Sequence, residues 1–390
     1  MVSIVMTLNL KPCPFSESKT IVIKLGSAVL TDAENNLDLA VMRDVCATAA
    51  DMMQKGRNVL IVTSGAVAAG RGALGLKVKP STISGKQALA SIGQVRVMNH
   101  WATCFAKHDI LVGQLLLSRG DMEDRRRYLN ARYTLEELLR RRCVPIINEN
   151  DTVTVDELKF GDNDGLAAVV AMKMHADALV LLSDVAGLYD GNPKTNSNAR
   201  LLETVEHVTP SLIEQLCVSP KGGSGVGSGG MKSKLMAARV ATAAGVAVCI
   251  VNGKVRGQLA AVVSGKFEGT YFPPHPHHYS RRRAWILGGR SVFNRRLLVD
   301  DGARDALITG KKSLLAAGIR EVEGRFEQGH IVEVLDLKGT LIGRGIVNYS
   351  SQELDSIKGR KTGEIKTILG ERHYDEAIHR DNLVLAPEFE

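Results

Sequence analysis

The sequence lacks the long apolar segments and paired cysteines that mark several classes of protein. No apolar run reaches the roughly 18 residues that a membrane-spanning helix requires, so we expect no membrane partner. Residues 1–18 lack a basic start and a small-residue cleavage site, which predicts a disordered leader rather than a signal peptide. Six cysteines without any Cys-x-x-Cys spacing indicate reduced thiols in a cytoplasmic protein rather than disulfides or a zinc site.

A complete P-loop is also missing. The stretch GGSGVGSGGMKSK (222–234) nearly matches that motif, but Met231 separates the last glycine from Lys232. A P-loop follows a buried strand, whereas the preceding segment TPSLIEQLCVSPK has no β-branched run. The chain has no Ser-His-Asp, metal-ligating or redox constellation either, so we expect no protein-bound metal ion.

The length of 390 residues predicts two domains, and the composition changes at one point in the chain. FPPHPHHYSRRR, at 272–283, has no hydrophobic period and is typical of a linker. We therefore expect a first domain over 19–272, a linker over 273–283 and a small, mainly β domain over 284–380. The net charge of +8 favours anionic ligands, but residues 281–390 are nearly balanced, with 19 Lys and Arg against 17 Asp and Glu.

Within 21–272, short apolar runs alternate with segments of helical periodicity. The expected strands are IVIKL (21–25), NVLIVT (58–63), ILVGQLLL (110–117), VPIIN (144–148), ALVLLS (178–183) and VAVCIV (246–251). The expected helices cover 38–55, 85–107, 133–142, 165–176 and 231–244. This order predicts an α/β fold, an open, mostly parallel α/β/α sandwich whose ligands bind beyond the carboxyl ends of the strands.

The first strand ends in a lysine within an apolar run. A charge buried there without a partner is unfavourable, so Lys24 should meet an anion at the sheet edge, unless its side chain extends to solvent. Gly26 adds a backbone N–H that a phosphate can approach closely.

Polar residues follow the other strands as well. Ser64 starts a helix, where it either caps that helix or helps to bind an anion. Asp151 and the run Asp162-Asn163-Asp164 indicate recognition of an ammonium group or organisation of lysines, with solvated turns as the alternative. Ser183 ends the strand ALVLLS, and Asp184 follows it.

The glycine-rich stretch leads directly into the helix expected from Met231. The first-turn N–H groups of that helix, with Lys232 and Lys234, would face a nucleotide phosphate, whereas a flexible linker is the alternative. Lys24 and Lys234 would then stand at one sheet edge with carboxylates between them. Phosphoryl transfer needs such fixed cations.

Six motifs occur in an order that resembles the amino-acid kinase family: IVIKLGSAVL, VTSGAVAAG, PIINEND, GDND, LLSDVAGLY and GSGGMKSKL. Within that family, the chain looks like the branch that phosphorylates the γ-carboxylate of L-glutamate in the first step of proline synthesis. The stretch VDDGARDALITGKKSLLAAGI and the segments after it resemble a PUA domain, which many members of that branch carry.

The resemblance implies roles for individual residues. Lys24 and Lys234 would stabilise the transferring phosphoryl group, and Asp164 would organise both lysines. Ser64, Asp151 and Asn163 would bind glutamate. The ATP site would comprise Lys24, Gly26, Ser183, Asp184, Ser228, Gly229, Gly230, Met231, Lys232, Ser233 and Lys234, with Mg²⁺ carried on the ATP phosphates.

The resemblance also implies partners beyond ATP and glutamate: inhibition by proline, a homo-oligomer, and transfer of the acyl phosphate to a separate glutamyl phosphate reductase. An RNA-binding protein acting through the PUA domain, or a kinase for another small carboxylate or carbamate, is the alternative. The balanced charge of the C-terminal part and the absence of a basic-aromatic stripe disfavour RNA.

Overall fold

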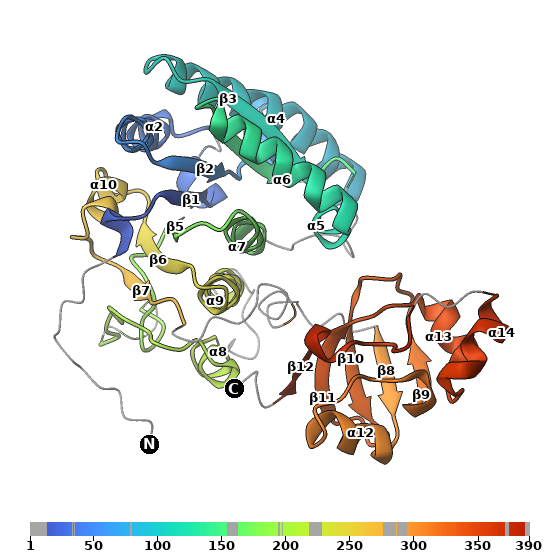
Figure 1. Cartoon of the computed structure of the whole chain (residues 1–390). Helices are drawn as coiled ribbons and strands as arrows, with labels where there is room; N and C mark the ends of the chain where they lie inside the picture. Colours follow the sequence, from blue (N-terminus) through green and yellow to red (C-terminus); the bar gives the residue numbers. More distant parts are fainter. Residues whose placement is uncertain are drawn as a thin grey trace.

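Two separate β-sheets organise the chain (Figure 1). The computed structural model describes residues 14–32, 34, 36–78, 80–153, 163–193, 196, 198–217, 228–275, 286, 295–370 and 374–386. The expected linker falls largely outside these residues. The first sheet belongs to the α/β part of the chain and the second to the C-terminal part, as the sequence predicted.

The first sheet has seven strands in the order β3-β4-β2-β1-β5-β6-β7. The strands are β1 (Thr20–Leu25), β2 (Asn58–Val62), β3 (Val112–Leu117), β4 (Val144–Glu149), β5 (Ala178–Ser183), β6 (Ala247–Asn252) and β7 (Thr270–Phe272). All neighbouring pairs are parallel except β6 and β7, which are antiparallel. The mostly parallel α/β sheet is therefore confirmed, with a short antiparallel edge strand that the sequence analysis did not predict.

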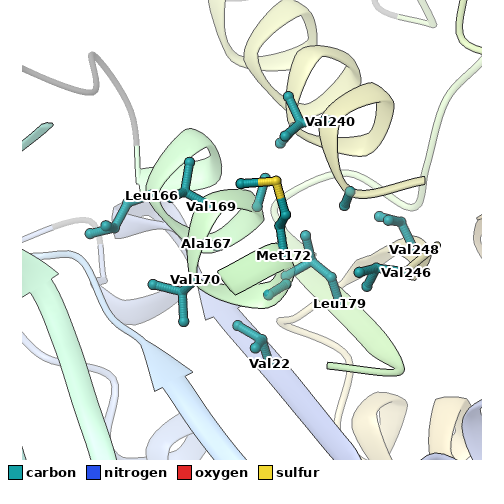
Figure 2. Packing of buried hydrophobic residues seen from close by; sticks show 14 of the residues in the cluster. Val22, Leu166, Ala167, Val169, Val170, Met172, Leu179, Val240, Val246 and Val248 are labelled. Carbon is teal, nitrogen blue, oxygen red and sulfur yellow. The ribbon is translucent and has the colours of Figure 1, made fainter. Parts of the chain in front are cut away.

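Helices cover both faces of this sheet (Figure 1). They are α1 (Ser27–Leu30), α2 (Leu39–Gln54), α3 (Ala66–Ala73), α4 (Ile83–Ala106), α5 (Arg119–Glu123), α6 (Arg125–Arg140), α7 (Asn163–Lys173), α8 (Pro210–Leu216), α9 (Ser228–Ala243) and α10 (Gln258–Val263). Successive strand residues point to opposite faces, so each strand contributes to two cores. Ile21 and Ile23 of β1 pack in one core with α2, α4 and α10. Val22 packs in the other core with α7 and α9 (Figure 2).

Two elements differ from the expectation in their extent. The helix expected over 133–142 begins eight residues earlier, at Arg125, because the Asp124 carboxylate caps it by accepting a hydrogen bond from the Arg127 N–H at 2.8 Å. Strand β3 is an edge strand, and Gln114 is exposed, so it is not buried on both faces.

Part of the expected leader is ordered. Pro14–Ser16 forms a 3₁₀ turn, and Phe15 is fully buried with edge-on contacts to the rings of Phe267 and Tyr271. The Arg57 guanidinium donates hydrogen bonds to the carbonyls of Phe15 and Ser16. The expectation of disorder is therefore wrong for residues 14–18, because a buried aromatic side chain fixes them; residues 1–13 lie outside the described part.

The second sheet has five strands in the order β12-β11-β10-β8-β9. The C-terminal strands and helices are β8 (Arg296–Val299), α12 (Asp301–Ile308), β9 (Ile319–Glu323), β10 (Ile331–Asp336), β11 (Leu341–Ile346), α13 (Ser351–Ile357), α14 (Ile365–Leu369) and β12 (Leu383–Leu385). Its own core includes Leu297, Val334 and Ile342. The sequence analysis expected a small, mainly β domain that ends at residue 380. It did not predict α13, α14 or β12, and β12 pairs with β11 beyond that residue.

Helices α3 and α4 approach each other through glycine. A Cβ atom added to Gly93 would lie 1.7 Å from the Ala66 carbonyl oxygen, and one added to Gly70 would lie 2.0 Å from the Leu89 carbonyl oxygen. No real Cβ reaches such distances, so any side chain at either position would separate the two helices. Because α3 begins two residues after Ser64, this contact also fixes the position of the loop that follows β2.

We predict that Gly93→Ala lowers the free energy of unfolding by about 1–3 kcal/mol or more, since overpacking forces backbone shifts. Thermal unfolding of the full chain measures the effect. Gly120→Ala is the matched control, because its added Cβ would meet only Ser118 Oγ at an ordinary 3.7 Å. Equal midpoints for the two variants would contradict the close-contact explanation.

Candidate active site

The strand alternation in β1 decides where Lys24 points. Lys24 shares its face with Val22, the face covered by α7 and α9, and its side chain is only 3% exposed. The sequence-based expectation that this lysine meets an anion is confirmed. The Lys24 ammonium nitrogen lies 2.5 Å from Asp164 Oδ1.

Asp164 lies in the first turn of α7 and has no exposed side-chain surface. Its other oxygen, Oδ2, lies 3.0 Å from the Lys234 ammonium nitrogen and accepts a hydrogen bond from the Ser233 hydroxyl at 2.7 Å. Burial alone would raise the pKa of this carboxyl, but the two ammonium groups outweigh it and hold the pKa below the ordinary value. Asp164 is thus an ionised carboxylate shared by two lysines from different elements.

This cluster carries an excess of positive charge. Among the described groups, two ammonium groups and one carboxylate leave one net positive charge in a largely buried place. The low polarity of such a place strengthens its attraction for an anion. The carboxylate also keeps the two lysines close together, which their mutual repulsion would otherwise oppose.

Lys234 and Ser233 are brought to Asp164 by α9, which begins at Ser228. The expectation of a loop over 228–230 is therefore wrong: Ser228, Gly229 and Gly230 form the first turn of the helix. Glycine can adopt helical angles despite its low propensity, and first-turn N–H groups need no helical partner. Lys232 is exposed, whereas Lys234 is buried, because the two positions lie on different faces of α9. Residues 218–227, which include Gly225, lie outside the described part.

Gly26 and Ser183 stand at the ends of neighbouring strands. The Gly26 N–H donates to the Leu182 carbonyl at 3.3 Å, and Ser183 Oγ donates to Asp184 Oδ1 at 3.2 Å. A Cβ added to Gly26 would lie 3.6 Å from the Lys24 ammonium nitrogen. This distance is an ordinary van der Waals contact, so the site does not require glycine here for space. The hydrogen bond to Leu182 occupies the Gly26 N–H, which the sequence analysis expected to face a phosphate.

Ser64 and Asn163 are brought together as well. Asn163 Nδ2 lies 2.9 Å from Ser64 Oγ and 2.7 Å from the Thr63 carbonyl oxygen. Asn163 is the residue before Asp164, so this pair adjoins the charged cluster. Asp151 lies two residues after the end of β4, the parallel neighbour of β2, and thus at the same sheet edge as Ser64. Asp162 lies outside the described residues.

Two amide residues near this pair were missed by sequence reasoning. Asn148 Oδ1 accepts a hydrogen bond from Asn163 Nδ2 at 2.8 Å, and Asn148 Nδ2 donates one to Gln94 Oε1 at 2.8 Å. Asn148 had a signal, as an amide at the end of an otherwise apolar strand run. Gln94 had none, because a single glutamine on a long helix has no distinctive spacing.

Known proteins resemble this chain over most of its length. A sequence profile described as "Amino acid kinase family" matches residues 19–252. The glutamate 5-kinases of Syntrophotalea carbinolica and Moorella thermoacetica are 46% and 45% identical to the chain. Both alignments cover 95% of this chain, and they cover 98% and 97% of the relatives.

The chain belongs to the amino acid kinase family, in its glutamate 5-kinase branch. A second profile, of the PUA domain, matches residues 295–369, which span most of the second sheet. An isopentenyl phosphate kinase of known structure covers 65% of this chain and 99% of its own, with a TM-score of 0.46 and 17% identity. No helix in the described parts of this amino acid kinase has the length and apolar character needed to cross a membrane.

We predict that Lys24→Ala and Lys234→Ala each lower kcat by about 10²-fold or more, because each removes one fixed cation from the place where phosphoryl charge develops. Steady-state phosphoryl transfer measures the loss, and thermal unfolding checks that the variants are folded. Lys55→Ala is the control, since that lysine is 61% exposed and pairs only with Asp51 in the described contacts. Turnover near the wild-type value in either variant would remove that lysine from the mechanism.

Proposed function

We propose that this chain is an ATP-dependent glutamate 5-kinase, which phosphorylates the γ-carboxylate of L-glutamate as the first step of proline synthesis. The observation that carries the proposal is the buried carboxylate of Asp164 between Lys24 and Lys234. The similarity to glutamate 5-kinases over 95% of the chain supports glutamate as the substrate.

The reaction needs no protein base. The γ-carboxylate of glutamate has an ordinary pKa of about 4.3, so it is already ionised near neutral pH. One of its oxygens attacks the γ-phosphorus of ATP, and the bond from that phosphorus to the β,γ-bridging oxygen breaks. The products are γ-glutamyl phosphate and ADP. Lys24 and Lys234 balance the charge on the phosphoryl and bridging oxygens, and Asp164 holds the two lysines in place.

Mg²⁺ enters this scheme as part of the substrate MgATP. Among the described residues, no group of three or more His, Cys, Asp or Glu side chains could hold a metal ion. The buried carboxylate of Asp164 is already engaged by two ammonium groups. This donor set fits Mg²⁺ bound by ATP phosphates and water, where it would neutralise phosphate charge.

The two substrates divide the site between them. ATP is bound by the strand ends at Lys24, Gly26, Ser183 and Asp184 and by the start of α9, Ser228–Lys234. Glutamate is bound by Ser64, Asp151 and Asn163, on the side of β2 and β4. The support is topological: β1 and β5 are neighbours, and β2 and β4 are neighbours on the other side of β1.

The remaining parts of the proposal concern regulation and setting. Proline inhibits the enzyme by competing with glutamate at Asp151 and Asn163, and the enzyme is a cytoplasmic homo-oligomer. Residues 19–272 form the catalytic domain, and the PUA domain contributes to assembly or regulation. A separate glutamyl phosphate reductase consumes the labile acyl phosphate.

Trapping with hydroxylamine tests the activity. We predict that the full chain, with MgATP and hydroxylamine, forms glutamyl hydroxamate from L-glutamate. Aspartate, acetylglutamate and carbamate are the competing substrates in the same assay. If one of them gives product and glutamate gives none, the assignment to glutamate is wrong.

The same assay tests inhibition by proline. We predict that added proline lowers hydroxamate formation and that raising the glutamate concentration relieves the inhibition, because both ligands use one site. Inhibition that saturating glutamate leaves unchanged would place proline elsewhere on the protein.

RNA binding through the PUA domain is not favoured, since the C-terminal part carries 19 basic against 17 acidic residues. Retention on a polyanion resin across a salt series distinguishes the two functions. Phosphate-driven binding weakens steeply with salt, whereas weak retention at every salt concentration agrees with a kinase whose PUA domain binds no RNA.

A further inference from the structure

A chain of three buried or half-buried amides connects helix α4 to the glutamate side of the site. It runs from Gln94 on α4, through Asn148 at the end of β4, to Asn163 at the start of α7. Gln94 is 9% exposed and Asn148 is 2% exposed. The three residues lie far apart in the sequence, so the fold alone joins them.

Backbone groups fix the orientation of two of these amides. The Thr63 carbonyl can only accept a hydrogen bond, so the Asn163 atom 2.7 Å from it must be the NH₂ nitrogen. The Glu149 N–H can only donate, so the Asn148 atom 2.9 Å from it must be the carbonyl oxygen. The neighbouring backbone acceptor or donor thus determines which end of each amide is oxygen and which is nitrogen.

This orientation determines what Asn163 presents to a ligand. With its NH₂ group directed at Thr63, Ser64 and Asn148, its carbonyl oxygen Oδ1 is turned away from them. This oxygen is buried and has no hydrogen-bond partner among the residues that the structure describes. An unpaired buried acceptor is unfavourable unless a ligand supplies a donor. The ammonium group of an amino acid is such a donor.

Gln94 completes the arrangement from the other end. Its Oε1 accepts the hydrogen bond of Asn148 Nδ2, while its own Nε2 is buried and has no partner in the described part of the chain. Only the oxygen of the Gln94 side chain is therefore used. Without that oxygen, Asn148 would bury an unpaired donor and would rotate or shift to satisfy it, which would disturb its contact with Asn163.

We propose that Gln94 is a positioning residue for the amino-acid substrate: through Asn148, it holds the Asn163 amide with its carbonyl oxygen toward the substrate ammonium group. This inference rests on the proposed function for the identity of the substrate. Gln94 does not itself contact the substrate. Through the two asparagines it increases the affinity for glutamate, and it has no effect on the affinity for ATP.

The test compares two substitutions at Gln94 in the full chain. Gln94→Leu keeps the approximate volume and removes the acceptor oxygen, so we predict a KM for glutamate raised about tenfold or more. The KM for ATP should stay within about twofold, and saturating glutamate should restore most of kcat. Gln94→Glu keeps an acceptor oxygen and replaces the unpartnered NH₂ group with a second oxygen. Burial favours the neutral, protonated carboxyl, so its KM for glutamate should stay closer to the wild-type value than that of Gln94→Leu.

A matched control separates positioning from stability. Gln258 is also 9% exposed, and its Nε2 donates to the Glu268 carbonyl, but it takes no part in the amide chain. Gln258→Leu should therefore lower the thermal midpoint and leave the KM for glutamate unchanged. The proposal is overturned if Gln94→Leu behaves like Gln258→Leu, if the KM for ATP rises as much as that for glutamate, or if Gln94→Glu loses as much affinity as Gln94→Leu.

If the proposed function itself is wrong, the assay gives a different result from the one expected when only the role of Gln94 is wrong. In that case the wild-type chain gives no hydroxamate with glutamate, and another amino acid gives product. The same three variants are then compared on that substrate, because its ammonium group is the donor that would meet Asn163 Oδ1. Equal KM values across wild type and Gln94→Leu for the accepted amino acid would still overturn the role of Gln94.

Discussion

The structure depends on one buried interaction, the carboxylate of Asp164 held between two lysine ammonium groups. A lone lysine inside a strand, or a lone aspartate inside a helix terminus, would be unfavourable where water is excluded. Together, the Asp164 carboxylate stabilises both lysine ammonium groups, and these three groups carry one net positive charge. The sheet, α7 and α9 must keep their relative positions for this compensation to hold, so the core that Val22 shares with both helices also maintains the site (Figure 2).

The polar side chains of the site are also held in one orientation before any ligand binds. Backbone N–H and C=O groups at the ends of β2 and β4 direct the amides of Asn148 and Asn163. The close contact of α3 with α4 at Gly70 and Gly93 fixes the loop that contains Ser64. Preorganised polar groups need no rearrangement when charge develops in the reaction. The scaffold around the site therefore contributes to function through geometry rather than through direct contact.

The sequence identified most residues of the candidate site, but it did not identify Asn148 and Gln94, which a chain of hydrogen bonds connects to Asn163. Lys24 was identifiable because a charge within an apolar strand requires a partner. Asp164 was one of several acidic residues in its stretch, and the structure shows that its side chain lies at the start of α7 between the two lysines. The start of α9 was placed three residues too late, since glycine at 229–230 suggests a loop when local propensity alone is considered. Phe15 was assigned to a disordered leader because its partners, Phe267 and Tyr271, lie far away in the chain.

The sequence by itself determined the positions of the main strands and helices of the kinase domain, the change to a β-rich module, and the family, because periodicity and motif order are properties of neighbouring residues. Only the tertiary structure decided which groups meet. The strand order β3-β4-β2-β1-β5-β6-β7 sets which strand ends are adjacent, and hence that Lys24 and Lys234 share one carboxylate. It also set the link from Gln94 to Asn163 across 69 positions of sequence, counting from residue 94 to residue 163. Such contacts result from the packing of the whole core, in which many weak contributions add up, so no local pattern encodes them.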